Sequence, residues 1–205
     1  MDAESLIAVL DNEIVELNSA YSTYERLYRG DSATRQLLSD SDSAFFGDLY
    51  IIYLNYISVA VSRLLDPETT GKKSNLTIFT LIAVLKSDGH PEADELHLRL
   101  QDIKTRAYNF TDPRNQLVSH LDYDTNHIDS GKKPIPSFLK SEFEEFYRNT
   151  GKLMNDIQTI IGMPPSMYEC IVRHGCGRKL IHRLQSASDH IASKISNKAS
   201  HRAAR

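Results

Sequence analysis

The chain has 205 residues, of which 40% are hydrophobic and 25% are charged. This is the composition of a globular protein, and the length allows one substantial core or one core with an appendage. It excludes a disordered, collagen-like or disulfide-stapled chain.

The formal net charge of −3 conceals an uneven distribution along the chain. Residues 173–205 contain eight basic residues and one acidic residue, a net charge of +7, whereas residues 1–172 carry −10. A basic end on an acidic body can mark a polyanion-binding segment, but it is also typical of a solvated C-terminus, which is the interpretation we prefer. The composition therefore excludes an extensively basic nucleic-acid-binding surface, and it leaves open a small phosphate-directed site.

The cysteine content and the N-terminus indicate a protein of a reducing compartment. Cys170 and Cys176 are too few for a disulfide framework. Residues 1–10 contain acidic residues where a secretory signal would be basic.

The longest apolar stretch, residues 49–65, is interrupted by Asn55, Ser58 and Arg63. It falls short of the roughly 20 residues that cross a bilayer. We therefore expect a soluble cytoplasmic protein with no membrane contact.

The hydrophobic periodicity predicts an all-α protein. The most apolar segment, residues 45–65, should be a central helix, with N-cap candidates at Asp40 to Ser43. Asp112 should cap a further helix that has Pro113 at its first position. We expect helices over residues 3–28, 45–65, 77–86, 91–109, 113–121, 137–161 and 166–195, with loops at 66–74 and before 137, and a possible interruption at 174–177.

The most informative motif lies at the start of the helix expected from Pro113. Arg114 and Asn115 are followed by His120, in the sequence RNQLVSH. Cleaving RNA without a metal ion needs an acceptor for the 2′-hydroxyl proton and a donor for the leaving 5′-oxygen, and a histidine can do either. An arginine supplies a permanent cation and a planar fork of donors for the phosphoryl oxygens, and an asparagine can assist.

This motif resembles the signature of the HEPN superfamily, in which an arginine and a polar residue are followed by a histidine. The sequence SRLLDP at residues 62–67, continuing as ETTGKKSNLTI, resembles the abortive-infection, AbiU-type branch. The resemblance covers roughly residues 49–124, and residues 165–205 have no counterpart in it.

The resemblance implies an up-and-down helical bundle over residues 1–165, followed here by a basic C-terminal helix and tail over 166–205. It also implies a metal-independent endoribonuclease that needs no cofactor and acts in phage defence or as a toxin, with a possible antitoxin or regulatory protein as partner. Two copies of the motif would meet across a homodimer, with Arg114, Asn115 and His120 as the site residues and RNA as the substrate. Some members have lost catalysis and bind protein or nucleotide partners.

Other interpretations stay open. Arg114 and His120 are about 240° apart around a helix, so they do not share one face, a constraint that a composite site would remove. They could instead be an ion-paired arginine and a packed histidine of a plain helical interaction domain. HEPN toxins that are controlled by AMPylation typically carry a tyrosine two residues after the histidine, where this chain has Asp122, so that control is doubtful here.

Weaker patterns have ordinary structural explanations. Cys170, His174, Cys176 and His182 match no standard zinc spacing, and incidental thiols are the preferred interpretation. Arg63 should form an ion pair at a helix end with Asp66. The three tyrosines at 50, 53 and 56 should be core residues rather than a base-stacking platform, and the basic loops at 71–73 and 131–133 match no P-loop.

Overall fold

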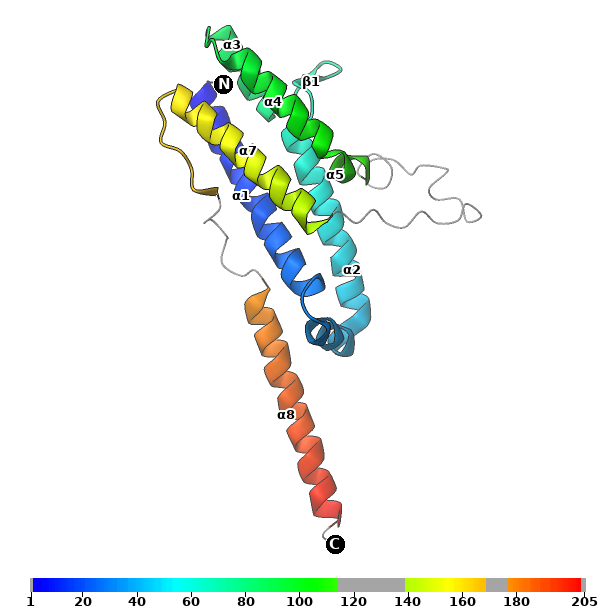
Figure 1. Ribbon diagram of the computed structural model, residues 1–205. Helices are drawn as coiled ribbons and strands as arrows, with labels where there is room; N and C mark the ends of the chain where they lie inside the picture. The colour runs from blue at the N-terminus through cyan, green and yellow to red at the C-terminus, as the bar shows by residue number, and fades with distance from the viewer. Residues whose placement is uncertain (1, 114–138, 169–176, 204–205) are drawn as a thin grey trace, which may run out of the picture.

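The computed structural model describes residues 2–113, 139–168 and 177–203. The helices are α1 (Ala3–Tyr28), α2 (Ser32–Leu65), α3 (Ile78–Ser87), α4 (Ala93–Arg106), α5 (Tyr108–Pro113), α7 (Lys140–Ile160) and α8 (Arg178–Ala203), and the strands are β1 (Thr69–Thr70) and β2 (Lys73–Ser74). The fold is all-α, as predicted. α1 and α4 run in one direction and α2 and α7 in the other, which gives an up-and-down bundle, and α8 projects from one end of it (Figure 1).

α1 confirms the helix expected over residues 3–28. The carboxylate of Asp2 caps it by accepting a hydrogen bond of 2.9 Å from the backbone N–H of Ser5. Hydrogen bonding to the side chain of Ser5 and to its backbone lowers the pKa of Asp2. The side chains of its buried face recur every three or four residues and form much of the core: Leu6, Leu10, Ile14, Leu17, Tyr21 and Tyr24.

α2 is longer than the sequence analysis expects. Asp31 caps its first turn, and the helix bends at Asp42, where the backbone is extended and the carboxylate accepts a 3.0 Å hydrogen bond from Phe45 N–H. The cap predicted before Phe45 is therefore correct, but α2 begins at Ser32, earlier than the start that the sequence predicts at residue 45. The reason is that Leu37 and Leu38 are buried, so this polar-looking segment forms a short amphipathic helix of its own.

The loop expected at residues 66–74 folds into a small exposed hairpin in which β1 and β2 pair antiparallel around Gly71. The side-chain amide of Asn75 donates to the carbonyl of Pro67 at 2.8 Å and closes the hairpin against the end of α2. Thr77 then caps α3.

α5 corrects the helix restart that the sequence predicts at Asp112. Asp112 and Pro113 follow residues of α5 that are already helical, so neither begins a helix. α5 forms because Phe110 is fully buried and anchors this short segment to the core. The rest of the helix expected over 113–121 lies outside the described residues.

α7 ends at Gly162, whose φ of +78° is the left-handed conformation that a glycine adopts readily. The N–H groups of Gly162 and Met163 bond to the carbonyls of Thr159 and Gln158, as in a Schellman motif. The helix expected from Ser166 is wrong at its start, because Ser166 N–H bonds instead to the Asn155 and Gln158 side chains. The last helix, α8, begins at Arg178.

Among the described side chains of α8, those of its first turns contact the bundle. Ile181 and Leu184 pack against a small cluster formed by Leu27, Leu38 and Phe46. Beyond Leu184 the helix extends away from the bundle, and its side chains from residue 185 to residue 197 are exposed (Figure 1).

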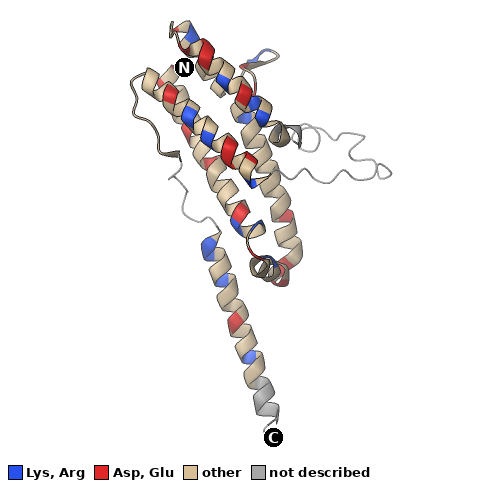
Figure 2. Ribbon diagram, viewed as in Figure 1, with Lys and Arg blue, Asp and Glu red and all other residues tan. Residues whose placement is uncertain are grey.

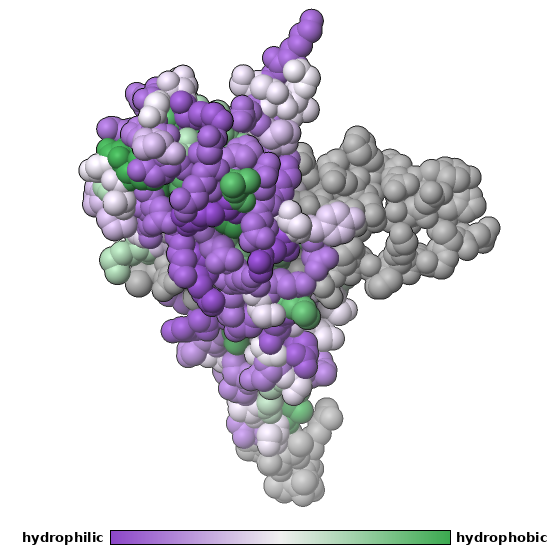
Figure 3. All heavy atoms as spheres, turned by 45° about the horizontal axis from the view of Figure 1, so that its top comes forward, coloured by the Kyte–Doolittle hydropathy of each residue, from purple (hydrophilic) through white to green (hydrophobic). Residues whose placement is uncertain are grey.

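α2 contains a stretch long and apolar enough to cross a membrane, and one third of that stretch is buried inside the bundle. Leu54, Ile57, Val61 and Leu64 are among its buried residues, which are part of the main core. The central helix of a bundle has this composition for that reason. The molecular surface turned to the viewer in Figure 3 is largely hydrophilic, with small separate hydrophobic patches.

Candidate functional site

The predicted site residues Arg114, Asn115 and His120 lie outside the described residues, between α5 and α7. The described residues nearest to them in the sequence belong to the two ends of the chain that flank the interval 114–138, and these ends lie against each other.

The end at α5 is anchored to the core. The Phe110 ring packs against those of Phe143 and Phe146, with centroids 6.1 and 6.0 Å away. The buried hydroxyl of Ser58 in α2 donates a hydrogen bond to the Phe110 carbonyl. The residue that precedes Arg114 therefore belongs to a helix that is held by both α2 and α7.

The end at α7 is capped by Glu142. Its Oε2 accepts a 2.7 Å hydrogen bond from Leu139 N–H. Its Oε1 accepts a 2.8 Å hydrogen bond from the Asn109 side chain of α5. One carboxylate therefore ties the last described helix before the interval to the first helix after it.

Two cations beside these ends are ion-paired. Arg106 bonds to Asp102 at 2.9 Å and to Glu145 at 3.0 Å, and Lys140 bonds to Glu25 at 2.6 Å. These carboxylates raise the pKa values of Arg106 and Lys140. Since the pairs are exposed, they contribute little stability, but they occupy the cations with carboxylates and link α4 and α1 to α7.

A cavity of about 470 Å³ lies between α4 and α7, close to Arg106. Its lining includes Arg99, Asn149 and Lys152, and Arg99 is itself bonded to Asp156 at 2.6 Å. The cavity is open and mixed in charge, and its described lining contains no histidine, cysteine or serine that could act as a nucleophile or general base.

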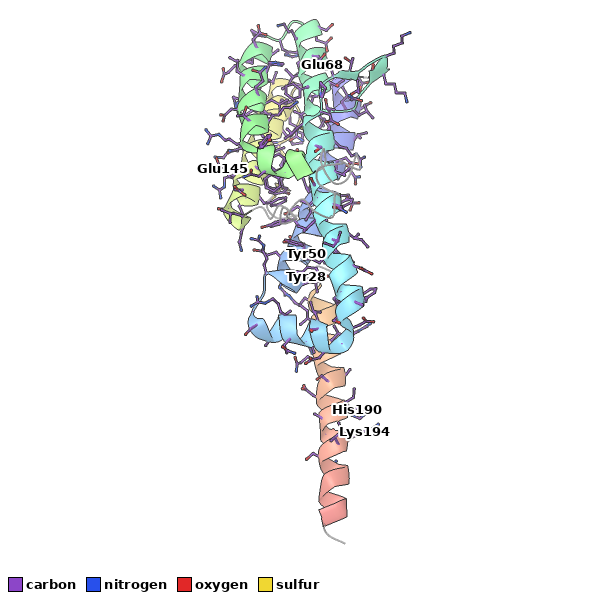
Figure 4. All side chains as sticks on the ribbon, turned by 90° about the vertical axis from the view of Figure 1, so that its right-hand side faces the viewer. Tyr28, Tyr50, Glu68, Glu145, His190 and Lys194 are labelled. Carbon is purple, nitrogen blue, oxygen red and sulfur yellow. The ribbon has the colours of Figure 1, made fainter. Side chains whose placement is uncertain are left out.

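A second cavity, of about 370 Å³, lies between the hairpin and α4. The ring of Phe79 forms its floor, with the His97 imidazole edge-on at 5.4 Å and the Lys104 ammonium 5.2 Å from the ring centroid. Glu68 lies at its rim, at the base of the hairpin (Figure 4). The sequence analysis missed this group. The sequence signal that could have identified it is the spacing of His97, Gln101 and Lys104, which places the three residues on one face of a helix.

The tyrosine and arginine predictions have clear outcomes. Tyr50 packs against Tyr24 and Tyr28, with ring centroids 5.7 and 5.2 Å away (Figure 4). Tyr50 and Tyr53 are half-buried against the core, as expected. The prediction is wrong for Tyr56, which is 39% exposed because it lies on the outer face of α2. Arg63 forms its ion pair with Glu13 of α1 at 3.0 Å, whereas the sequence analysis expected Asp66. The reason is that α1 packs against α2, which a local pattern cannot reveal.

The zinc pattern cannot be assembled from the described residues, because Cys170, His174 and Cys176 lie outside them and His182 is an exposed residue of α8. Within the described ranges, no group of three or more histidine, cysteine, aspartate or glutamate side chains is arranged to hold a metal ion.

Comparisons of this chain with protein-family models, with curated proteins and with solved structures find no match.

Proposed function

We propose that this protein is a metal-independent endoribonuclease of the HEPN type, which acts in the cytoplasm in phage defence or as a toxin. The observation that carries the proposal is the sequence RNQLVSH, in which Arg114 directly follows the end of α5. The all-α bundle and the firm attachment of α5 to the core support it, because a catalytic motif needs a rigid base.

His120 is the proposed general acid and base, and Arg114 stabilises the charge on the phosphoryl oxygens. Asn115 is an accessory hydrogen-bonding group. Attack of the 2′-hydroxyl on the adjacent phosphorus forms a 2′,3′-cyclic phosphate and releases the 5′-hydroxyl of the next nucleotide. The reaction needs no metal ion or cofactor, since both protons are transferred by side chains.

Two copies of the motif are proposed to meet in a homodimer. The ion pairs of Arg106 and Lys140 support this arrangement, because two of the described cations near the motif are already bonded to carboxylates. Binding of the RNA backbone would then depend on Arg114 from both copies, and affinity should be modest and sensitive to salt.

A catalytically inactive HEPN module that binds a protein or nucleotide is the second candidate. The cavity beside Phe79 favours it, because an aromatic floor between Lys104 and His97 suits a base with a nearby phosphate. Nucleotide binding that His97→Ala weakens, without cleavage of RNA, would favour this candidate.

The test is cleavage of a single-stranded RNA by the purified full chain in the presence of EDTA. His120→Ala and Arg114→Ala should each lower the rate by at least about 100-fold, and Asn115→Ala by less. His90→Ala and Arg35→Ala are the matched controls. Each replaces a residue of the same type as one in the motif, at a position distant from it in the sequence, and both variants should retain the wild-type rate.

Equal cleavage by wild type and His120→Ala would contradict the assignment of the site. In cells, expression of the wild type should arrest growth, and His120→Ala should relieve the arrest. Arrest that persists with His120→Ala would contradict the toxin role.

A further inference from the structure

A third cavity lies between α7 and the segment that follows it, which turns back along the bundle (Figure 1). Five of its lining residues belong to α7, and the other three are the consecutive residues 166–168. Its volume is about 230 Å³, below the roughly 300 Å³ at which sites for drug-sized ligands begin. The cavity therefore suits a small ligand, of about one ring and one charged group.

Hydrogen bonds hold the wall opposite α7 in place. The N–H of Ser166 donates to Asn155 Oδ1 at 2.9 Å, and the Tyr168 carbonyl accepts a 2.8 Å hydrogen bond from the Tyr147 hydroxyl. Gly151 allows this close approach, since a Cβ there would lie 3.2 Å from the Tyr168 ring. The cavity is therefore bounded by backbone and by buried rings whose positions the fold determines.

The charged side chains of the lining are Arg148 and Lys152, and neither forms an ion pair with a described residue. They are four residues apart on α7 and therefore lie on one face of it. In Figure 2 the middle of α7 shows two blue turns with red turns on either side. The carboxylates of those neighbouring turns are bonded to other cations: Glu144 to Lys140 at 3.7 Å, Glu145 to Arg106 at 3.0 Å and Asp156 to Arg99 at 2.6 Å.

The side-chain amide of Asn155 adds a neutral donor. Because a backbone N–H can only donate, the atom that accepts from Ser166 must be Oδ1, which leaves the Nδ2 group without an acceptor among the described residues. The described lining contains no aspartate or glutamate. The carboxylate of Asp11 lies behind the wall, where it accepts from Ser166 Oγ and from the Tyr168 hydroxyl.

Two cations, an amide donor and aromatic walls suit a ligand with an anionic group and an apolar body. A phosphate monoester carries a charge of about −1.5 to −2 at neutral pH, which balances the two cations, whereas a carboxylate carries a single charge. The planar fork of an arginine and the ammonium group of a lysine are frequent partners of phosphate oxygens. The rings of Tyr147 and Tyr168 supply the apolar surface.

We propose that this cavity binds a small phosphate monoester that has a single ring as its organic group. Arg148, Lys152 and the Asn155 amide hold the phosphate, and Tyr147 and Tyr168 contact the ring. This site is separate from the proposed cleavage of RNA, and neither depends on the other.

The probe is phenyl phosphate, which combines both parts of the ligand. Inorganic phosphate and phenol each supply one part, and benzoate replaces the phosphate by a carboxylate. Calorimetric titration of the full chain at low salt should show that phenyl phosphate binds at least about tenfold more tightly than each of the other three, because it alone fills both parts of the site.

Asn155→Asp is the sharpest variant, because it keeps the acceptor for Ser166 N–H and replaces the amide donor by a carboxylate oxygen. It should weaken the binding of phenyl phosphate by at least about tenfold, and Arg148→Gln and Lys152→Gln should each weaken it by about tenfold. Asn197→Asp and Lys179→Gln, at exposed positions of α8, are the matched controls and should bind as the wild type does. Thermal unfolding of each variant shows whether its fold is retained.

Four results would overturn the proposal. They are no binding of phenyl phosphate, equal binding of inorganic phosphate (an adventitious ion only), unchanged binding by a folded Asn155→Asp, and tighter binding of a 5′-phosphorylated RNA that the same variants lose. The last would assign the cavity to RNA. Arg148→Gln and Asn155→Asp should cleave RNA at the wild-type rate, so failure of this site and failure of the nuclease assignment are distinguishable.

Discussion

At the scale of single residues, Asp11 accepts three side-chain hydrogen bonds in a cluster that joins distant parts of the chain. Its carboxylate accepts hydrogen bonds from Gln158 at 3.0 Å, from Ser166 Oγ at 3.1 Å and from the hydroxyl of Tyr168. Burial raises the pKa of Tyr168, and the bond to Asp11 raises it further. This cluster attaches the segment after α7 to α1, so it joins residues that are separated by most of the chain.

Tyr168→Phe should therefore lower the free energy of unfolding by about 1–3 kcal/mol, since it removes a buried hydrogen bond to a charged acceptor. Urea unfolding at neutral pH measures the change. Ser188→Ala, which removes an exposed hydroxyl on α8, is the control and should change stability by less than about 0.5 kcal/mol. Equal effects of the two substitutions would show that the Asp11 cluster contributes nothing.

Tyr28 predicts how stability depends on alkaline pH. Burial, aided by the neighbouring Tyr53, raises the pKa of Tyr28 from 10 to about 12, and its hydroxyl donates to the Phe46 carbonyl at 2.9 Å. Because the folded state holds this proton more tightly, the stabilisation is complete below pH 10 and is lost as the pH rises toward 12.

Tyr28→Phe should flatten the fall in stability over this alkaline window, because the variant has no proton to lose at this position. Urea midpoints of both proteins across the window measure the slope. Parallel curves for wild type and variant would contradict the role of Tyr28.

At the same scale, the sequence could predict caps better than partners. The cap before Phe45 was identifiable because an aspartate preceded an apolar run, and the structure places Asp42 there. The partner of Arg63 could not be identified from the sequence, since Glu13 belongs to another helix. A cap depends on residues that are neighbours in the sequence, whereas a tertiary contact depends on how the helices pack.

At the scale of elements, two helical glycines should respond oppositely to alanine. A Cβ added at Gly47 in α2 meets nothing within 4 Å, whereas one at Gly151 in α7 would lie 3.2 Å from the Tyr168 ring. That ring is held in place, because the Tyr168 hydroxyl bonds to Asp11 and the Tyr168 carbonyl accepts from Tyr147 at 2.8 Å.

Gly47→Ala should raise the free energy of unfolding by about 0.5–1 kcal/mol, the gain of an alanine in a helix. Gly151→Ala should lower it, since strain against Tyr168 exceeds that gain. Thermal or urea unfolding of the two variants gives the signs. If Gly151→Ala is more stable than the wild type, the Tyr168 ring moves aside at little cost and the argument from strain is wrong.

Helices with strong periodicity could be predicted closely, as α1 and α3 show. Segments whose secondary structure depends on tertiary burial could not be predicted in this way. The mostly polar segment 32–41 is helical because Leu37 and Leu38 are buried, and this burial cannot be recognised from the sequence. Pro113 suggested the beginning of a helix, but the residues before it from Tyr108 on are already helical, with Phe110 buried in the core.

At the scale of the whole molecule, the all-α class followed from periodicity alone, but the projection of α8 did not. The basic charge of the C-terminal region suggested a solvated tail, and the structure adds that this region is a long helix with isoleucines on its surface. The assignment of Arg114, Asn115 and His120 as site residues stays a prediction from the sequence. The structure shows that the helices on either side of this interval, α5 and α7, are joined by the Asn109–Glu142 hydrogen bond.

The central claim is that the protein cleaves RNA through the 2′-hydroxyl without a metal ion. The direct measurement is product analysis after incubation with RNA and with the same sequence made as DNA, both in EDTA. We predict that only the RNA is cut, that its products end in a 2′,3′-cyclic phosphate, and that His120→Ala forms none. Cleavage of the DNA, dependence on an added metal ion, or full cleavage by His120→Ala would contradict the claim.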